Sequence, residues 1–470
     1  MHISLSVKSK TPHTVHIVDK EHSKKLPQNI QQYATEALEL KKWATHAVGL
    51  LPIVDGKSIN YHIIVRIADT KKFSDCMEDV VAEVGALIKK TAKEFFLDLD
   101  TTIISHDDKE LLQQLFAVNL YAFTKYKKEK KKHHLTIKNS KTDAKKFEAL
   151  YQSLKITREL VNDPANSVHP KTVEEEVKKL FGKNKHIKIT TIKGKELEKK
   201  WLNGIYQVGK WSEHEPRLIL MEYKWSKKKW YDYALIGKWV CFDTGGYNIK
   251  LTGSMEDMKI DMAGAATVMG ILNYAIETKL TKNIIIGLPL VENMVSHNAY
   301  KPGDVITMYN GKTVEVGNTD AEGRLILGDT LSYIEKKYEP DTVFDFATLT
   351  GAQVVALGSR FAAILGRNEK LNKDIQSLWL QLKDRVRELP FYEPYFRTYT
   401  SDIADMNNMS KSWRMWPGTI GAGLFLSQFI ENKNWVHFDI AGPASIAGDT
   451  LTGGGATGCM IRLITHLLTK

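Results

Sequence analysis

Cysteine is scarce in this sequence. Cys76, Cys241 and Cys459 are the only three among 470 residues, and they lie far apart with no CxxC pair. Zinc knuckles and disulfide frameworks need closely or regularly spaced cysteines, so the sequence indicates neither of them. A chain without a disulfide pattern is typical of a reducing compartment. We therefore expect a cytoplasmic protein.

Long apolar runs are also missing. The longest candidates, such as residues 284–291, have the length of a buried strand, whereas a membrane-spanning helix needs about 20 apolar residues. Residues 1–8 alternate like a strand and lack the apolar core and cleavage site of a signal peptide. We expect no membrane partner and no secretory signal.

Positive charge is in excess: the formal net charge is +11 and the pI is near 9.1. An excess of positive charge is typical of proteins that bind an anionic partner. Nucleic acid bound by the basic N-terminal region is one alternative. The lysines gather at residues 125–134 and 224–230. The second cluster lies between two strand-like runs, so we interpret it as a hairpin tip. For both clusters a solvated surface is the favoured interpretation.

Residues 1–150 alternate between strand-like and helix-like runs, which predicts a small N-terminal α/β domain. We expect this domain to end in a connector helix over about residues 142–161. It holds no Asp, Glu, His or Cys cluster at ligand spacing, so we place no chemistry in it. Its expected strands are 14–18, 61–67 and 102–105, and its expected helices are 77–93 and 110–127.

Residues 151–470 predict a larger α/β domain with a central, mostly parallel or mixed sheet covered by helices on both faces. The nearly unbroken apolar run at residues 283–291 is typical of a strand buried on both faces. In such folds ligands bind at the carboxyl ends of strands. The expected strands are 217–223, 233–242, 283–291, 341–349 and 435–440, an expected helix covers 262–277, and Gly-containing loops follow at 243–246, 350–352 and 441–443.

The segment 318–325 places Asp320, Glu322 and Arg324 two residues apart. In extended backbone their side chains would point to one side, with neighbours about 7 Å apart. Two such carboxylates could grip a pair of cations, and Arg324 could hold an anion in its planar fork. We expect a helix from Leu325 onward. The alternative is a surface turn that runs into a helix.

Lys238 lies inside an apolar strand, where an unpaired ammonium is costly to bury. Lys238 either forms a buried salt bridge with Asp243 or Asp261, or acts as a metal ligand. In the second case burial and nearby cations lower its pKa. Lys238 and Asp243 are five residues apart, so sharing one site requires a bulge or bend near Trp239. Asp261 precedes a helix and could simply cap it.

Residues 318–325 reproduce the signature of the leucyl aminopeptidase family of dinuclear metallopeptidases, and residues 237–250 are similar to its lysine-and-aspartate segment. The resemblance covers residues 150–470 and implies a catalytic metallopeptidase domain there; the N-terminal part resembles the family in size and class. The agreement extends to residues 291–294, 298–304, 348–352 and 435–442.

The resemblance implies an aminopeptidase that removes N-terminal residues from peptides. It implies two divalent ions per subunit, manganese or zinc with magnesium or cobalt as alternatives, and a water or hydroxide between them. It also implies a homohexamer, a dimer of trimers. One ion would be held by Lys238, Asp243, Asp261 and Glu322, and the other by Asp243, Asp320 and Glu322.

By the same resemblance Lys250 stabilises the oxyanion, and Arg324 holds a bicarbonate that acts as general base. A methionine-containing wall would favour Leu-like or Met-like side chains, with plain core packing as the alternative. Trp239 stands where the family has glycine and could narrow the site or stack on a substrate; Thr244 and His297 also depart from the family pattern. The pocket counterparts are Met258, Asn318, Thr348, Leu349, Gly351, Ala441 and Ala444.

Overall fold

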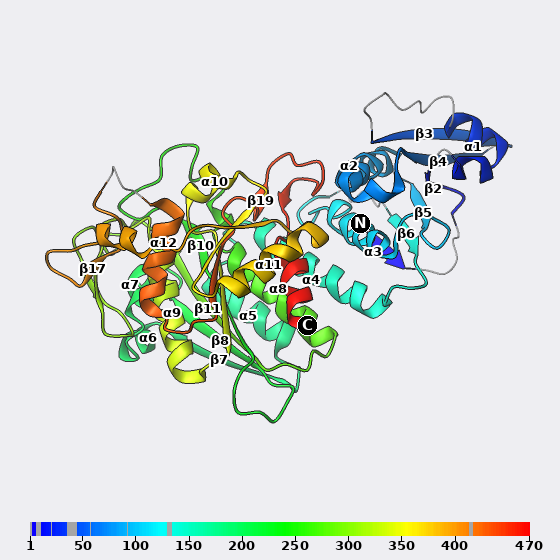
Figure 1. Ribbon diagram of the computed structural model, residues 1–470. Helices are drawn as coiled ribbons and strands as arrows, with labels where there is room; N and C mark the ends of the chain where they lie inside the picture. Colours follow the sequence, from blue (N-terminus) through cyan, green and yellow to red (C-terminus); the bar gives the residue numbers. More distant parts are fainter. Residues whose placement is uncertain are drawn as a thin grey trace. The chain divides into compact units, whose positions relative to one another are not determined.

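The chain forms two compact units (Figure 1): residues 1–151 with 447–455, and residues 152–446 with 456–470. The structure is a computed structural model. It describes residues 2–5, 11–19, 21–34, 45–56, 58–91, 93–128, 134–412 and 417–470. No helix in these ranges is long and apolar enough to cross a membrane. The helix predicted over residues 142–161 is present as α4, Ala144–Asn162.

The first unit is built on a six-stranded sheet. Its strands pair in parallel except at the β4–β3 edge, which is antiparallel. The predicted strands at 14–18 and 61–67 are confirmed as β2 and β4. The spatial order is β1 (His2–Leu5), β6 (His134–Lys138), β5 (Glu94–Asp98), β2 (Thr14–Val18), β4 (Ser58–Ile67) and β3 (His46–Asp55).

Among the described residues, three α-helices accompany this sheet: α1 (Gln28–Gln32), α2 (Phe73–Thr91) and α3 (His106–Asn119). The last two confirm the predicted helices at 77–93 and 110–127 in part: both start four residues earlier, and α3 ends at Asn119, so the helix predicted over residues 120–127 is wrong. The strand predicted at 102–105 is wrong. Those residues form the turn before α3, because the Ser105 side chain caps that helix by accepting a hydrogen bond from the Asp108 amide at 3.1 Å.

The second unit contains a nine-stranded sheet, and its mixed strand directions agree with the prediction. Its centre, from β18 through β14 and β9 to β11, is parallel, and antiparallel pairs flank it. The spatial order is β16 (Val386–Glu388), β15 (Ala362–Gly366), β18 (Trp435–Asp439), β14 (Thr342–Ala347), β9 (Tyr233–Gly237), β11 (Ile284–Asn293), β8 (Arg217–Tyr223) and β7 (Ile187–Lys193), with β10 (Trp239–Asp243) beside β11.

Helices cover both faces of this sheet. α8 (Ala263–Glu277) packs on one face, where a side chain at Gly237 would collide with Ala265. The preceding residue, Ile236, points to the other face and joins a buried core with Leu331 of α9 (Gly323–Tyr338). The other helices are α5 (Pro170–Phe181), α6 (Lys195–Lys199), α7 (Asn203–Gly209), α10 (Gly351–Leu357), α11 (Glu369–Leu382), α12 (Gly418–Leu426) and α13 (Ile461–Thr469).

Five further short strands in the described chain lie outside the two large sheets. They form a three-stranded and a two-stranded sheet: β12 (Val305–Thr307), β13 (Thr313–Glu315) and β17 (Met406–Asn407), and β19 (Ser445–Ile446) with β20 (Gly455–Ala456).

The basic segment 224–230 is not a hairpin tip, so that interpretation is wrong. β8 and β9 do not pair with each other, because β11 lies between them, antiparallel to β8 and parallel to β9. The segment therefore crosses the end of β11. The buried side chain of Asn283 holds it there, since Oδ1 accepts hydrogen bonds from the amides of Trp225 at 3.1 Å and Ser226 at 3.0 Å.

Because α8 packs closely against β14, we expect one added methyl group at Gly264 to have a large effect on stability. A Cβ at Gly264 would overlap the carbonyl oxygen of Phe346 in β14. We expect Gly264→Ala to lower the free energy of unfolding by at least about 1–3 kcal/mol, because the backbone has to shift. Urea unfolding measures this. Glu277→Ala, at the exposed end of the same helix, is the control, and equal stability of the two variants would contradict the prediction.

Candidate metal centre

An interruption of the sheet brings Lys238 to the carboxyl ends of the strands. Lys238 lies between β9 and β10, and the register of β10 against β11 shifts between Val240 and Asp243. In a regular strand, residues five apart point to opposite faces. The predicted bend near Trp239 is therefore confirmed, and it lets Lys238 and Asp243 reach one cluster.

The segment 318–325 differs from the expectation. It is not extended: residues 319 and 320 form a turn, Glu322 already has helical dihedral angles (φ −71°, ψ −38°), and α9 starts at Gly323. The predicted alternation of side chains is wrong, whereas the helix after Leu325 is confirmed. The alternative was a surface turn that runs into a helix. The turn and the helix are present, but the segment does not lie at the surface, because Glu322 is 1% and Arg324 6% exposed.

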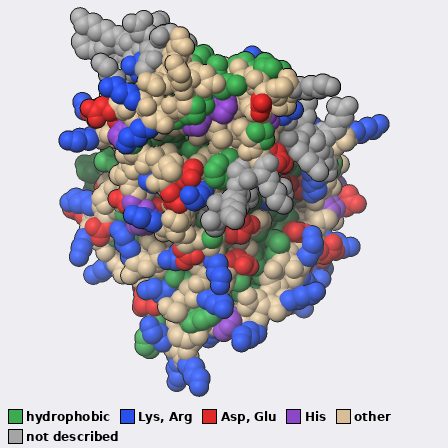
Figure 2. Space-filling model, turned by 90° about the vertical axis from the view of Figure 1, so that its right-hand side faces the viewer, with side chains coloured by type: hydrophobic (Ala, Val, Ile, Leu, Met, Phe, Trp, Pro, Cys, Tyr) green, Lys and Arg blue, Asp and Glu red, His purple; other side chains and the backbone are tan. Residues whose placement is uncertain are grey.

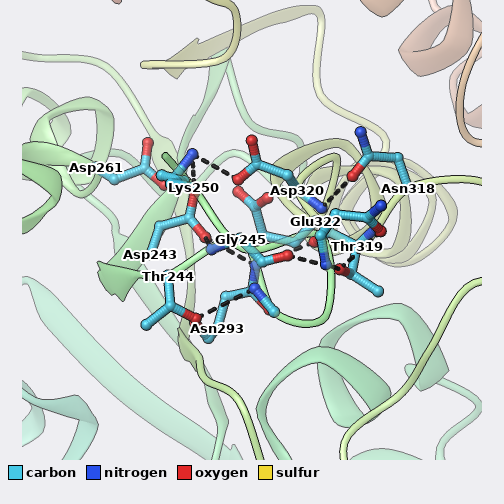
Figure 3. Close-up of polar contacts among 12 residues, drawn as sticks. Asp243, Thr244, Gly245, Lys250, Asp261, Asn293, Asn318, Thr319, Asp320 and Glu322 are labelled. Carbon is cyan, nitrogen blue, oxygen red and sulfur yellow. Dashed lines mark hydrogen bonds and ion pairs between the residues drawn. The ribbon is translucent and has the colours of Figure 1, made fainter. Parts of the chain in front are cut away.

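Polar side chains hold this turn against the loop after β10 (Figure 3). The Asn318 Oδ1 accepts a hydrogen bond from the Asp320 amide at 2.7 Å, and the Thr319 hydroxyl donates to the Gly245 carbonyl at 2.6 Å. Asn293, at the end of β11, donates to Asp243 Oδ1 at 2.8 Å and to the Thr319 carbonyl at 3.0 Å. Asn293 therefore ties the two halves of the cluster together.

Carboxylate oxygens from Asp243, Asp320 and Glu322 lie within 4.8 Å of one another. The Lys250 Nζ lies between two of them, 2.8 Å from Asp243 Oδ2 and 2.5 Å from Asp320 Oδ1 (Figure 3). Burial and the neighbouring Glu322 and Asp243 carboxylates together raise the pKa of Asp320 to about 7. Carboxylates crowded in this way gain from a bound cation, which relieves their mutual repulsion.

Lys238 forms the other side of the cluster. Its Nζ lies 2.7 Å from Asp261 Oδ1 and 3.0 Å from Glu322 Oε1, so the salt-bridge interpretation is confirmed for Asp261. Burial alone lowers the pKa of Lys238, but the Asp261 and Glu322 charges outweigh it and raise the pKa. The neutral amine that metal ligation needs therefore depends on a nearby cation.

Asp261 is not a helix cap. Its Oδ1 accepts hydrogen bonds from Lys238 and from the Thr348 hydroxyl at 2.7 Å, while α8 has Met262 at its N-cap position without a side-chain bond. The second oxygen of Asp261 and the Oε2 of Glu322 are buried without a hydrogen-bond partner in the described chain. Unpartnered buried carboxylate oxygens are rare.

The donor set fits divalent cations. Four carboxylates against two ammonium groups leave an excess of negative charge in a mostly buried site. Two of the carboxylate oxygens are free to act as ligands. Hard oxygen ligands with one amine suit manganese, magnesium or zinc without choosing among them.

Arg324 lies apart from this cluster. Its Nη1 donates to the Asn408 carbonyl at 2.8 Å, and the guanidinium lies 5.9 Å from the centre of the Phe425 ring. Its Nε is buried without a hydrogen-bond partner among the described residues. In the described chain Arg324 makes no hydrogen bond or ion pair with the four carboxylates.

The expected substrate-pocket residues are placed by neighbouring polar groups. Asp439, at the end of β18, accepts hydrogen bonds through Oδ1 from the amides of Leu349 at 3.1 Å and Ala441 at 3.2 Å. Thr348 reaches the cluster directly through Asp261. Met258 begins the short helix before Asp261, Gly351 begins α10 and Ala444 is buried, with no polar side-chain contact to the cluster among the described residues.

Trp239 is completely buried. It therefore has no exposed ring face on which a substrate could stack, and that expectation is wrong.

Three residues that position the site escaped the sequence analysis: Asn293, Asn408 and Asp439. Asn293 and Asp439 end the apolar strands β11 and β18, and a polar residue in that place is a signal that could have found them. Asn408 accepts hydrogen bonds from the Gly317 and Asn318 amides at 2.8 and 3.1 Å. No local pattern marks it.

The catalytic-domain model of the cytosol aminopeptidase family matches residues 155–465. This chain belongs to the cytosol aminopeptidase family. It is a metal-dependent aminopeptidase, a hydrolase, and the α/β fold and the family resemblance expected from the sequence are confirmed.

Relatives and solved structures agree with this assignment. The cytosol aminopeptidase of Pseudomonas aeruginosa is 38% identical over 375 residues, which are 77% of this chain and 74% of that protein. The crystal structure of the cytosol aminopeptidase from Coxiella burnetii superposes with a TM-score of 0.85 at 28% identity, covering 99% and 98% of the two chains. The bottromycin maturation enzyme BotP, in complex with Mn, gives 0.83 at 25% identity, covering 98% and 99%.

The position of Asn293 yields a prediction for this aminopeptidase. We expect Asn293→Ala to weaken metal binding by about 10–100-fold, because residues that orient ligands have effects of this size. Manganese titration of the metal-free protein, followed by calorimetry, measures the affinity. Asn310→Ala is a control, since the Asn310 side chain bonds the Gln428 carbonyl through Nδ2 and the Lys312 amide through Oδ1, away from the cluster. An unchanged affinity in Asn293→Ala would contradict the assigned role.

Proposed function

We propose that this aminopeptidase uses two divalent cations to remove N-terminal amino acids from peptides. The observation that carries the proposal is the convergence of four carboxylates and a buried lysine, with two carboxylate oxygens left unpartnered. The residues that hold the cations are Lys238, Asp243, Asp261, Asp320 and Glu322.

When bound, the cations would supply a water molecule of lowered pKa and polarise the scissile carbonyl. The residues around them position the peptide and its charge. Lys250 stands at the edge of the cluster with its side chain 14% exposed, so its ammonium can reach the oxygen of a bound carbonyl. We assign to Lys250 the stabilisation of the oxyanion that develops there.

Arg324 holds a bicarbonate ion that acts as general base. Its buried Nε is free of hydrogen bonds in the described structure while Nη1 is held by Asn408, so the guanidinium is oriented and still has donors for an anion. A bicarbonate held by this fork would supply a general base beside the metal centre.

A preference for Leu-like or Met-like N-terminal residues follows from the pocket. Its proposed members are mostly apolar or small, and an adaptable methionine wall fits such side chains. The pocket consists of Met258, Asn318, Thr348, Leu349, Gly351, Ala441 and Ala444.

The identity of the metal, the cellular compartment and the oligomeric state also belong to this proposal. Manganese is supported by BotP, which is described in complex with Mn, and zinc, magnesium and cobalt are the other candidates. The names of the relatives support a cytoplasmic protein. The homohexamer, a dimer of trimers, is tested by light scattering of the purified chain.

Nucleic-acid binding has no comparable support. Lys127 and Lys128 are exposed, but Lys130 and Lys131 lie outside the described residues. On the face shown in Figure 2, basic side chains are interspersed with acidic ones over the described surface. The names of the relatives do not mention nucleic acid.

The test is hydrolysis of leucine, methionine and glutamate amides by the purified chain. We expect leucine and methionine amides to be preferred, activity to be lost with a chelator, and manganese or zinc to restore it. Bicarbonate depletion should slow the unmodified enzyme and leave Arg324→Ala unaffected. Lys250→Ala should lower kcat more than it raises KM. Activity that persists in chelator would overturn the proposal.

A further inference from the structure

A second pocket, of about 550 Å³, lies at the far end of α9 from the metal centre. It is formed by the α6–α7 connection, the β12–β13 turn and the last turns of α9, and α6, α7 and α9 lie side by side in Figure 1. Aromatic and basic side chains line it, and no carboxylate does. The lining residues are Lys200, Trp201, Tyr309, Tyr333, Lys336 and Lys337.

Trp201 occupies a position where glycine is ordinarily found. It follows the end of α6 with φ of 62°, in the left-handed region. The amide of Leu202 bonds to the Leu197 carbonyl and that of Trp201 to the Glu198 carbonyl, both at 2.9 Å, which is the helix ending that favours glycine. The tryptophan is nevertheless 62% exposed. Tryptophan does not favour this backbone conformation as glycine does. A residue that departs from such a local preference points to a functional reason.

The walls of this pocket are tied together by a buried carboxylate. Asp329, on α9, is fully buried and accepts hydrogen bonds from the Tyr309 amide at 2.8 Å and the Gly204 amide at 2.6 Å. It therefore fastens the turn that carries Tyr309 and the start of α7, next to Trp201, to the same helix. One turn further on, Tyr333 contacts Tyr309 edge to face, with ring centres 5.2 Å apart. The aromatic walls are held in place before any ligand arrives.

The lysines supply positive charge beside these rings. The Lys336 Nζ lies 5.8 Å from the centre of the Tyr309 ring, and the Lys337 Nζ lies 5.2 Å from that of Tyr333. No ion pair of either lysine is found in the described chain, whereas the third lysine, Lys200, lies 3.7 Å from the exposed Glu196 carboxylate of α6. Lysines at a helix C-terminus also complement the helix dipole. The helix dipole of α9 does not explain Lys200 and Trp201, because these two residues follow α6.

We propose that this pocket binds a small anion that carries an aromatic ring, of the nucleoside monophosphate class. The ring stacks on Trp201 and the tyrosines, because every base offers a π face to an aromatic side chain. The phosphate lies among Lys200, Lys336 and Lys337, which bind it as point charges. The inference is independent of the peptidase mechanism, since the pocket residues of α9 lie about 17–23 Å along the helix from Glu322.

The probe is adenosine monophosphate, titrated into the metal-loaded full-length chain at low salt and followed by calorimetry. Trp201→Gly is the decisive variant. Because glycine prefers this backbone conformation, the thermal midpoint should stay equal or rise. Binding should weaken roughly tenfold, since the stacking partner is lost. The double variant Lys336→Gln/Lys337→Gln should also weaken binding and reduce its salt dependence.

A matched control exists elsewhere on the surface. Trp230 is 49% exposed, with the Lys228 Nζ 5.3 Å from its ring centre, in the segment that crosses β11. Trp230→Gly and Glu322→Gln, the latter in the metal centre, should leave the affinity for adenosine monophosphate unchanged.

Four results would overturn the proposal: no saturable binding below about 1 mM, an unaltered affinity in Trp201→Gly, an equal loss in Trp230→Gly, or binding of adenosine or inorganic phosphate as tight as that of the monophosphate.

Discussion

Glu322→Gln is expected to lower kcat/KM for leucine amide by at least about 10³-fold, beyond the 10–100-fold effects of residues that only orient ligands. The substitution keeps the size of the side chain and removes its charge. In the structure Glu322 joins the two sides of the cluster, because it lies among the oxygens of Asp243 and Asp320 and also 3.0 Å from Lys238. Steady-state kinetics together with metal analysis measures both the rate and the metal content.

The control for this variant is Glu339→Gln, at the exposed C-terminal end of the same helix. It should keep full activity and full metal content. Chelator should have no further effect on Glu322→Gln, because the variant has already lost the activity that depends on the metals. Wild-type kcat/KM in Glu322→Gln would remove Glu322 from the catalytic centre.

Asp345→Ala is expected to destabilise the protein by about 3–5 kcal/mol, the usual cost of breaking a buried ion pair. Asp345 lies in β14, in the middle of the sheet, with no exposed surface. Its Oδ1 lies 2.5 Å from the His437 Nδ1, and its Oδ2 accepts a hydrogen bond from the Trp435 indole at 2.7 Å. The substitution leaves both partners buried and unpaired, and urea unfolding measures the loss.

The size of this loss depends on pH. Burial lowers the pKa of His437, but the Asp345 charge outweighs burial and raises the pKa above its ordinary value. A raised histidine pKa contributes stability that is fully present below the unfolded pKa of about 6.5 and is lost as the pH rises through the folded pKa. The difference in stability between wild type and Asp345→Ala should therefore narrow as the pH increases above about 6.5.

Asp341→Ala is the matched control, because Asp341 is exposed just before the same strand. Its unfolding free energy should equal that of wild type within about 0.5 kcal/mol. A difference between wild type and Asp345→Ala that grows with pH would show that the His437 charge does not contribute in the stated direction.

Much of the fold could be predicted because periodicity is a local property. The apolar run of β11 and the small-residue helix α8 were found from sequence to within one or two residues. Partners in the sheet could not be found in this way. β8 and β9 are neighbours along the chain, yet β11 lies between them, because strand order depends on which buried faces fit together and not on sequence distance.

The metal centre, like the fold, could be predicted from the sequence in part. Side-chain chemistry and spacing marked these polar residues, and the family resemblance implied the ligand set Lys238, Asp243, Asp261, Asp320 and Glu322, which the structure brings together. The conformation of residues 318–325 was predicted wrongly, because a period of two applies only to extended backbone and α9 begins within the segment.

The sequence by itself determined which groups are available for chemistry and to which family the chain belongs, since both depend on residue identity and spacing. Tertiary structure alone decided what each group contacts. It put Arg324 against Asn408 and Phe425, gave Asn293 its bridging role, and placed Trp201 in a pocket with tyrosines and lysines from two other segments. The reason is physical: these contacts join residues far apart in the chain, and burial and charge pairing act on distances in space.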